Sequence, residues 1–257
     1  MKINEIFLSL QGEGHFSGTP AVFIRFSGCN LRCPFCDTQH ESGKEMTEEE
    51  IVTQVASFSA KHVVVTGGEP ALFLTETLVD ALHAAHKIVA VETNGTRLLP
   101  KNVDWITLSP KFAFFKKSDQ GTSDSPVISV VSSTPSSTIS SIPVVSSAVS
   151  SASNVPTTVH AVASDASDAV LIASKTSFAA VVLPRCDELK AVFTSAADFA
   201  AVEKEYLAIP ATFRYVQPCD TGEPELNRRI TEEAVRWCQN HPYWSLSVQL
   251  HKLLGLP

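Results

Sequence analysis

The residues with the clearest chemical potential in this chain are three closely spaced cysteines, Cys29, Cys33 and Cys36. The thiolate is the form of cysteine that binds metal, so three clustered thiols can hold one face of a metal centre. Structural zinc and ferredoxin-type iron–sulfur clusters both take four ligands. No fourth ligand completes a local set, because the other cysteines lie far away in the sequence. The spacing therefore predicts a cluster with one open iron, available to an incoming ligand.

Other uses of the three thiols remain open at this point. A zinc site could recruit a distant cysteine or the nearby His40. Three buried cysteines without a role are a weaker alternative, because the polar Asn30 and Arg32 between them are untypical of a core. We expect no disulfide, since the chain begins without an apolar signal-peptide core and a reducing cytoplasm is then the default compartment.

Length, charge and hydropathy narrow the class of protein. At 257 residues the chain can form one large domain or two small ones. Its formal net charge of -7 argues against nucleic-acid binding through a basic face. No segment is long and apolar enough to span a bilayer. We therefore expect an acidic, cytoplasmic enzyme that binds neither nucleic acid nor membranes.

An alternation of strands and helices must position the cysteines. The patterning predicts strands over 3–10, 21–26, 62–65, 87–92, 105–108, 187–193, 213–216 and 246–250. It predicts helices over 74–86, 195–206 and 224–240, and one that starts at Thr47 with Glu50 completing a capping box. This alternation indicates a parallel sheet or a partial barrel. In such folds ligands gather at the carboxyl ends of the strands.

Glycine-rich and polar segments follow several of the predicted strands at those ends. They are 11–14 (Gln-Gly-Glu-Gly), 66–70 (Thr-Gly-Gly-Glu-Pro), 92–96 (Glu-Thr-Asn-Gly-Thr) and 109–111 (Ser-Pro-Lys). Glycine lets backbone approach a ligand closely. Each segment alone is a weak signal, but their shared position predicts a single ligand site.

Arg25 is a charged residue inside an otherwise apolar predicted strand. An unpaired charge there would be costly. One interpretation is that the side chain reaches solvent or pairs with a neighbouring carboxylate. The other is that its guanidinium points into a pocket and grips a ligand carboxylate in bidentate fashion.

Residues 116–180 differ in character from the rest of the chain. Between Ser125 and Ser164 there is no Asp, Glu, Lys or Arg, and Ser, Val, Thr, Ala and Pro dominate. Such low-complexity composition is typical of poorly ordered sequence. We expect one domain over 1–257 that this insert interrupts.

Together these motifs resemble two nested families. The Cys29, Cys33 and Cys36 spacing and the 66–70 segment resemble the radical S-adenosylmethionine superfamily. Further segments are similar to 7-carboxy-7-deazaguanine synthases: 10–14, 23–26, 28–31, 36–38, 92–96, 109–111, 188–190 and 249–252. The resemblance covers residues 1–111 and about 181–257, and leaves the insert outside it.

The resemblance implies a shortened, partial (β/α) barrel and a carbon–nitrogen lyase activity. Members of the family convert 6-carboxy-5,6,7,8-tetrahydropterin to 7-carboxy-7-deazaguanine with loss of ammonia, on the route to queuosine and other 7-deazapurines. The cofactors would be a [4Fe-4S] cluster, S-adenosylmethionine and Mg²⁺. A 5′-deoxyadenosyl radical would take a hydrogen atom from C6 of the pterin. The implied partners are an external electron donor of the flavodoxin or ferredoxin type and a second copy of the chain in a homodimer.

The same resemblance implies roles for individual residues. Cys29, Cys33 and Cys36 would hold the iron–sulfur cluster, and Thr38 would bind Mg²⁺. The implied substrate-binding residues are Leu10, Gln11, Gly12, Glu13, Arg25, Thr66 and Pro257, the last through its terminal carboxylate. The implied S-adenosylmethionine site comprises Phe35, Asp37, Gly68, Glu69, Thr93, Asn94, Ser109, Pro110, Lys111, Gln217, Pro218, Cys219 and Asp220.

Some features depart from the family pattern. Cys219 stands where a methionine is expected, Cys186 stands where a small residue is usual, and the insert follows 109–111 closely. Two other functions remain as alternatives. A glycyl-radical-enzyme activase shares the cysteine spacing but acts on a protein, and a zinc or iron–sulfur binding module would not be catalytic.

Overall fold

The structure is a computed structural model that describes residues 1–33, 36, 38, 41–112, 170–172, 181–183 and 185–256. The predicted insert at about 116–180 lies outside these residues, except for β7 (Val170–Ile172), which pairs antiparallel with β8 (Val181–Leu183). The predicted ligand residues Phe35, Asp37 and Pro257 also lie outside the described residues. Their roles and the single interrupted domain stay predictions.

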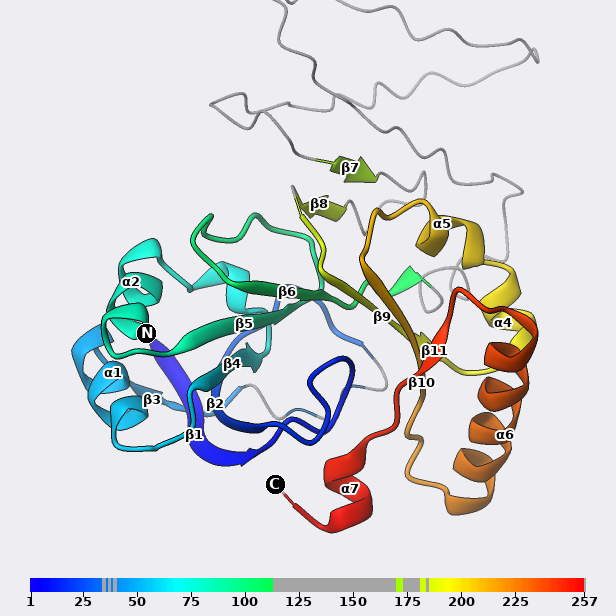
Figure 1. Cartoon of the computed structure of the whole chain (residues 1–257), viewed down its shortest axis with the longest axis horizontal. Coiled ribbons are helices and arrows are strands. Elements are labelled where there is room, and N and C mark those ends of the chain that lie inside the picture. The colour runs from blue at the N-terminus through cyan, green and yellow to red at the C-terminus, as the bar shows by residue number, and fades with distance from the viewer. Residues whose placement is uncertain are drawn as a thin grey trace, which may run out of the picture.

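A nine-stranded sheet forms the centre of the molecule, in the order β11-β10-β9-β6-β5-β4-β2-β1-β3 (Figure 1). The strands are β1 (Lys2–Leu10), β2 (Pro20–Phe26), β3 (Lys44–Glu45), β4 (His62–Gly67), β5 (Ile88–Thr93), β6 (Trp105–Leu108), β9 (Glu188–Phe193), β10 (Phe213–Pro218) and β11 (Ser245–Leu246). All pairings from β2 to β11 are parallel, whereas β1 pairs antiparallel with β2 and β3. The sheet does not close on itself, so the predicted partial barrel is confirmed.

Most of the helices lie at the two ends of the sheet, whereas the last helix lies below it, near the C-terminus (Figure 1). They are α1 (Glu48–Ala56), the 3₁₀ helix η1 (Pro70–Leu72), α2 (Glu76–Ala84), α4 (Ala196–Ala200), α5 (Glu203–Leu207), α6 (Pro224–Asn240) and α7 (Leu250–Leu254). The predicted capping box is present in α1, where Glu50 N donates to Thr47 Oγ1 over 3.2 Å and Thr47 N donates to a Glu50 carboxylate oxygen over 2.8 Å. The helix predicted over 195–206 is divided at the buried Val202 into α4 and α5. This break brings Phe199 and Tyr206 together in a stack with ring centroids 5.4 Å apart.

The last predicted strand, over 246–250, is wrong beyond Leu246. Its alternating pattern suited a strand, but the backbone leaves the sheet after β11 and forms α7. Leu250 N donates to Gly12 O over 2.8 Å instead of to a neighbouring strand. A contact far away in the sequence therefore overrides the local pattern here.

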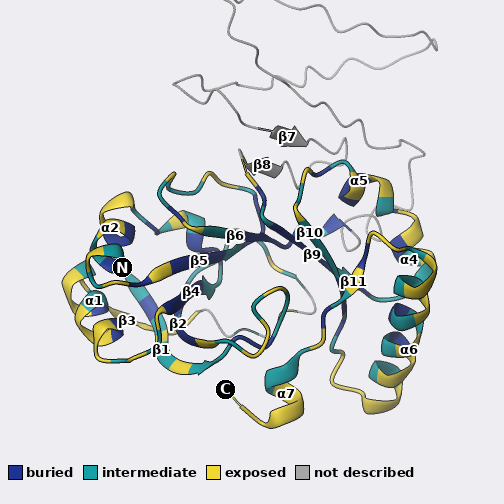
Figure 2. Ribbon diagram, in the orientation of Figure 1, coloured by how far each residue is buried: buried dark blue, intermediate teal, exposed yellow. Residues whose placement is uncertain are grey.

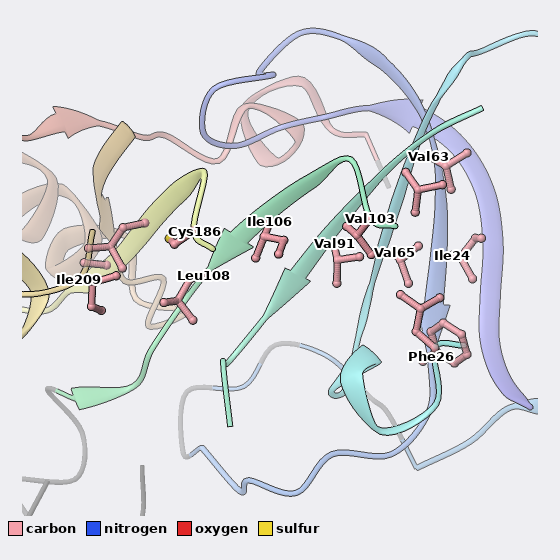
Figure 3. Packing of buried hydrophobic residues seen from close by; sticks show 14 of the residues in the cluster. Ile24, Phe26, Val63, Val65, Val91, Val103, Ile106, Leu108, Cys186 and Ile209 are labelled. Carbon is pink, nitrogen blue, oxygen red and sulfur yellow. The ribbon is translucent and has the colours of Figure 1, made fainter. Parts of the chain in front are cut away.

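The two faces of the sheet differ in chemistry. Alternate side chains of one strand point to opposite faces. On one face, apolar residues of neighbouring strands, such as Ile24, Val65 and Ile106, form the core (Figure 3) together with helix residues such as Ile51 and Leu82. Buried positions follow the strands and the inner sides of the helices (Figure 2).

No helix among the described residues is both long enough and apolar enough to cross a membrane.

Candidate active site

The opposite face of the sheet carries the polar residues. Arg25 alternates with Ile24 and Phe26, and its register partner on β4 is Thr66. Glu92 lies beyond Thr66 on β5, since Thr66 Oγ1 donates to Glu92 Oε2 over 3.4 Å. Lys190 alternates with the buried Leu189 and Ala191 on β9. The parallel register therefore brings residues far apart in the sequence onto one surface.

A pocket of about 630 Å³ opens on this face at the carboxyl ends of the strands. Its volume lies within the usual range for small-molecule sites, about 300–1,000 Å³. Nineteen of the predicted ligand residues line it: Leu10, Gln11, Gly12, Glu13, Arg25, Cys29, Cys33, Cys36, Thr38, Thr66, Gly68, Thr93, Asn94, Ser109, Lys111, Gln217, Pro218, Cys219 and Asp220. The predicted strand-end segments therefore line one pocket, whereas their roles as ligands stay predictions.

The three cysteines contribute one wall of the pocket. Cys29 and Cys33 are half-buried and Cys36 is exposed. Burial raises the pKa of the Cys29 and Cys33 thiols, while the charge of Lys111 acts to lower that of Cys33. Among the described residues, no group of three metal-binding side chains comes close enough to hold a single ion.

The glycine segment after β4 fits against the backbone that leads into the cysteine loop. Gly68 N donates to Phe26 O over 3.0 Å, and Glu69 N donates to Gly28 O over 2.9 Å. A Cβ on Gly68 would overlap the Gly28 carbonyl, so this approach requires glycine. The segment thus fixes where the cysteine loop begins.

Glu69 and Pro110 are predicted S-adenosylmethionine ligands that do not line the pocket. The fully buried Glu69 carboxylate accepts hydrogen bonds from Thr93 Oγ1 over 2.6 Å and from Asn94 N over 2.7 Å. Burial raises its pKa, which these hydrogen bonds partly oppose. Glu69 therefore links the carboxyl ends of β4 and β5 by hydrogen bonds without lining the pocket itself.

A buried charge network occupies the middle of the polar face. The Lys190 ammonium pairs with Glu13 and lies 3.5 Å from Glu92 Oε2. Gln249 Nε2 donates to Glu13 Oε1 over 2.9 Å, and Gln11 Nε2 donates to Glu92 Oε1 over 3.0 Å. Burial acts to lower the pKa of Lys190. The charges of Glu13 and Glu92 outweigh this effect and raise that pKa above its usual value. The network holds the Glu13 carboxylate in ionised form at the pocket surface.

Stability should depend on pH through Glu13. Burial acts to raise its pKa, but Lys190 and the hydrogen bonds outweigh this and lower it to about 2. A carboxyl with a lowered pKa stabilises the fold above its unfolded pKa of about 4.5, and that contribution disappears as the pH falls toward the folded value. We expect Glu13→Gln to unfold more easily than wild type near pH 7, with the difference narrowing from about pH 5 to about pH 3. Urea unfolding of the cluster-free proteins measures this, and a constant difference would contradict it.

Arg25 lines the pocket and also pairs with a neighbouring carboxylate. Its Nε lies 2.7 Å from Glu5 Oε1, and its guanidinium carbon lies 5.8 Å from the centre of the Phe7 ring. The pairing interpretation is therefore confirmed. This ion pair engages Nε of the guanidinium. A fork of two donors suits a planar carboxylate.

The far wall of the pocket comes from β10 and the C-terminal segment. The carboxyl end of β10 supplies 217–220, and Lys252 Nζ lies 2.5 Å from Asp220 Oδ2. Hydrogen bonds from Lys252 and Gly222 lower the pKa of Asp220 to about 2. The helix α7 thus contacts both Gly12, through Leu250 N, and Asp220, through Lys252.

Several pocket residues were not predicted as ligands, although their segments carried the resemblance. They are Glu92, Lys190, Gln249, His251 and Lys252. Lys190 gave a usable signal, because Glu188 and Lys190 alternate with apolar residues in a predicted strand, where charges need partners. Gln249 was hidden by its assignment to a strand.

The donor set fits the cofactors that the cysteine spacing implies. In an iron–sulfur cluster each thiolate binds a different iron atom. This arrangement suits three thiols that line one pocket but are not close enough together to hold a single ion. The Thr38 hydroxyl, an oxygen donor of the kind magnesium prefers, lines the same pocket. The pocket therefore has the donors for both groups.

Comparison with known proteins agrees with this chemistry. Residues 23–112 match the radical SAM superfamily. A 7-carboxy-7-deazaguanine synthase from Bacteroides thetaiotaomicron is 37% identical over 255 residues, which cover 99% of this chain and 98% of the relative. One from Burkholderia multivorans is 31% identical over 277 aligned positions, covering 99% and 98%.

The fold has a counterpart among solved structures. The crystal structure of QueE from Escherichia coli superposes with a TM-score of 0.60 at 22% identity, covering 97% of this chain and 94% of that one. At this identity the match speaks for the fold alone, whereas the two relatives are similar over nearly their whole length. The chain belongs to the 7-carboxy-7-deazaguanine synthase family of the radical SAM superfamily.

Proposed function

We propose that a single pocket of this chain binds both S-adenosylmethionine and 6-carboxy-5,6,7,8-tetrahydropterin. The chain is a radical SAM lyase that forms 7-carboxy-7-deazaguanine from that pterin with loss of ammonia, a step in queuosine biosynthesis. When bound, the cluster and S-adenosylmethionine supply a carbon-centred radical that removes a hydrogen atom from the substrate. The remaining tasks, which are binding, orientation and exclusion of water, belong to the protein.

The observation that carries the proposal is the placement of the two predicted ligand sets. The cysteine wall and the strand-end residues Asn94, Ser109 and Gln217 would bind the cluster and S-adenosylmethionine. Gln11, Glu13 and Thr66, which line the same pocket, would bind the pterin. Carboxylate and amide groups such as Glu13 and Gln11 match the donors and acceptors of a pterin ring.

Thr38 would complete a magnesium site with the substrate and water as its other ligands. Magnesium commonly keeps several waters and takes few protein ligands. The supporting observation is that Thr38 lines the same pocket as the proposed pterin ligands.

Arg25 would bind the substrate carboxylate through its Nη edge. We expect Arg25→Gln to raise KM for the pterin by about 10- to 200-fold, equivalent to the loss of a charge-assisted hydrogen bond of about 1.5–3 kcal/mol. Formation of 5′-deoxyadenosine without substrate should be retained. Glu5→Gln is the matched control, because it breaks the ion pair on Nε and leaves the guanidinium in place. Equal KM values for Arg25→Gln and wild type would remove Arg25 from the substrate site.

Pro257 would place its terminal carboxylate against the pterin. The supporting observation is that α7, which ends three residues earlier, contacts Gly12, a proposed pterin ligand that lines the pocket. Appending one or two residues after Pro257 should raise the pterin KM and leave the iron content unchanged. An unaltered KM would show that the terminal carboxylate does not bind the pterin.

Direct assay tests the function as a whole. Anaerobic incubation with carboxytetrahydropterin, S-adenosylmethionine, Mg²⁺ and a reductant should yield 7-carboxy-7-deazaguanine. A glycyl-radical-enzyme activase would cleave S-adenosylmethionine without forming this product, and a zinc module would do neither.

We further propose a flavodoxin- or ferredoxin-type protein as the electron donor, a homodimer as the assembly, and the cytoplasm as the compartment. These three proposals come from the family resemblance, and a reducing compartment also keeps cluster thiols available. Sedimentation of the reconstituted protein measures the assembly, and a monomer would contradict it. Turnover with a purified flavodoxin or ferredoxin, in place of a chemical reductant, tests the donor. Cell fractionation tests the compartment.

A further inference from the structure

Glu188 is a buried carboxylate for which the reaction described above has no use. Its side chain is 3% exposed and lies on the polar face of β9, two residues before Lys190, but it does not line the pocket. Burial raises its pKa to about 7, so the fold carries a desolvation cost at this position. A buried carboxylate is costly unless a hydrogen-bond donor or a cation interacts with it.

The partner of Glu188 is the loop that follows β1. His15 N donates to Glu188 Oε2 over 3.0 Å. Gly14 packs on the same carboxylate so closely that a Cβ at Gly14 would overlap it, and its φ of 64° lies in the left-handed region. Replacing the carboxylate by an apolar side chain would leave the His15 N–H without this acceptor.

This loop also carries the pterin-side residues Gln11, Gly12 and Glu13. Strand β9 holds the loop at two points, because Lys190 pairs with the Glu13 side chain and Glu188 binds the His15 backbone. The loop is further held by the stack of His15 on Trp105, with ring centroids 5.1 Å apart. Two of these anchors, Glu188 and Trp105, do not line the pocket, so they can set the position of the loop without touching a ligand there.

We propose that Glu188 is a positioning residue of the pterin site, which holds the Gln11–Glu13 segment in place by accepting the His15 N–H and by packing on Gly14. The inference rests on the proposed assignment of Gln11 and Glu13 to substrate binding. A misplacement of about 1 Å in such a site can cost about 100-fold in rate. Loss of the Glu188 carboxylate should therefore act on pterin binding and leave S-adenosylmethionine binding intact.

The first test compares three variants of the reconstituted holoenzyme. Glu188→Ala should raise KM for the pterin about 10- to 100-fold, with the Kd for S-adenosylmethionine unchanged. Glu188→Gln keeps an oxygen acceptor of the same reach and should stay within about threefold of wild type. Glu233→Ala is the matched control, because Glu233 Oε2 also accepts a backbone N–H, that of Ala196 over 3.0 Å, away from the pocket. An unchanged KM in Glu188→Ala, or equal losses in pterin and S-adenosylmethionine binding, would overturn the proposal.

A second pair of variants leaves β9 intact. Gly14→Ala should reproduce the rise in KM, because its methyl group displaces the Glu188 carboxylate. Gly18→Ala lies in the same loop with a φ of 87° and has no atom within 4 Å of the added Cβ, so it imposes similar backbone strain without the contact. In the Glu188→Ala background Gly14→Ala should cost less than it does alone. Equal effects of Gly14→Ala and Gly18→Ala would contradict the proposed contact.

Hydrogen exchange separates this inference from the proposed function. Amide exchange in the peptide covering residues 11–19 should accelerate in Glu188→Ala and remain near wild type in Glu188→Gln. This readout needs no turnover. If wild type makes no carboxydeazaguanine, the proposed function fails. If wild type is active and exchange is the same in all variants, the role of Glu188 fails instead.

Discussion

Cys33→Ala is expected to abolish both the iron–sulfur cluster and all cleavage of S-adenosylmethionine. Cys33 is one of the three cysteines that line the pocket, and its removal leaves two thiols for a cluster that already lacks a fourth cysteine. An open iron can accept a substrate-like ligand, but a second vacancy exposes the cluster to loss. Iron and sulfide content and 5′-deoxyadenosine formation after anaerobic reconstitution measure the effect.

The chain offers a control for this cysteine variant. Cys238 is a half-buried cysteine on α6 that does not line the pocket. Cys238→Ala should therefore retain the full complement of about four irons per chain and wild-type turnover. Cluster retention or turnover in Cys33→Ala would refute the assignment of the three ligands. Zinc in place of iron in the wild-type protein would point to the non-catalytic alternative.

Lys190→Met should destabilise the fold and eliminate turnover. The Lys190 side chain is 7% exposed and is placed between Glu13 and Glu92, so its removal leaves two carboxylates of low exposure without their cation. Breaking a buried ion pair from one side costs about 3–5 kcal/mol. Denaturant unfolding measures the stability loss, and the assay for carboxydeazaguanine measures the activity.

Two further variants sharpen the Lys190 result. The double variant Glu13→Gln, Lys190→Met lacks one of the two carboxylates that Lys190→Met leaves without a cation. It should therefore regain part of the stability without regaining activity. Arg228→Met breaks exposed ion pairs with Glu225 and Glu232 on α6 and should change stability by at most about 1 kcal/mol. A Lys190→Met protein within that same range would show that the network contributes little to the fold.

The C-terminal segment shows where local pattern was misleading. Residues 246–250 alternate in a way typical of a strand, yet Gln249 bonds Glu13 and Leu250 N bonds Gly12 O. Both partners lie at the other end of the sequence. Periodicity reports which faces of an element are apolar, but it does not report which distant backbone group will accept a hydrogen bond.

The sequence by itself determined the chemistry, because cysteine spacing and strand-end glycines are local properties. Cys29, Cys33 and Cys36 predicted the cluster, and the capping residue Thr47 predicted the start of α1. Alternation of strands and helices indicated a parallel sheet or a partial barrel, since each buried strand needs helices to cover it, and the family resemblance favoured the barrel.

Only the tertiary structure decided how the charges are paired. Arg25 was equally open to a neighbouring carboxylate or a ligand, and the antiparallel register of β1 and β2 settles that Glu5 takes its Nε. The partners of Glu188 and Lys190, which are His15 N and Glu13, became identifiable only once β9 was placed next to the loop after β1. Pairing across about 175 residues depends on strand order and register, which no local pattern contains.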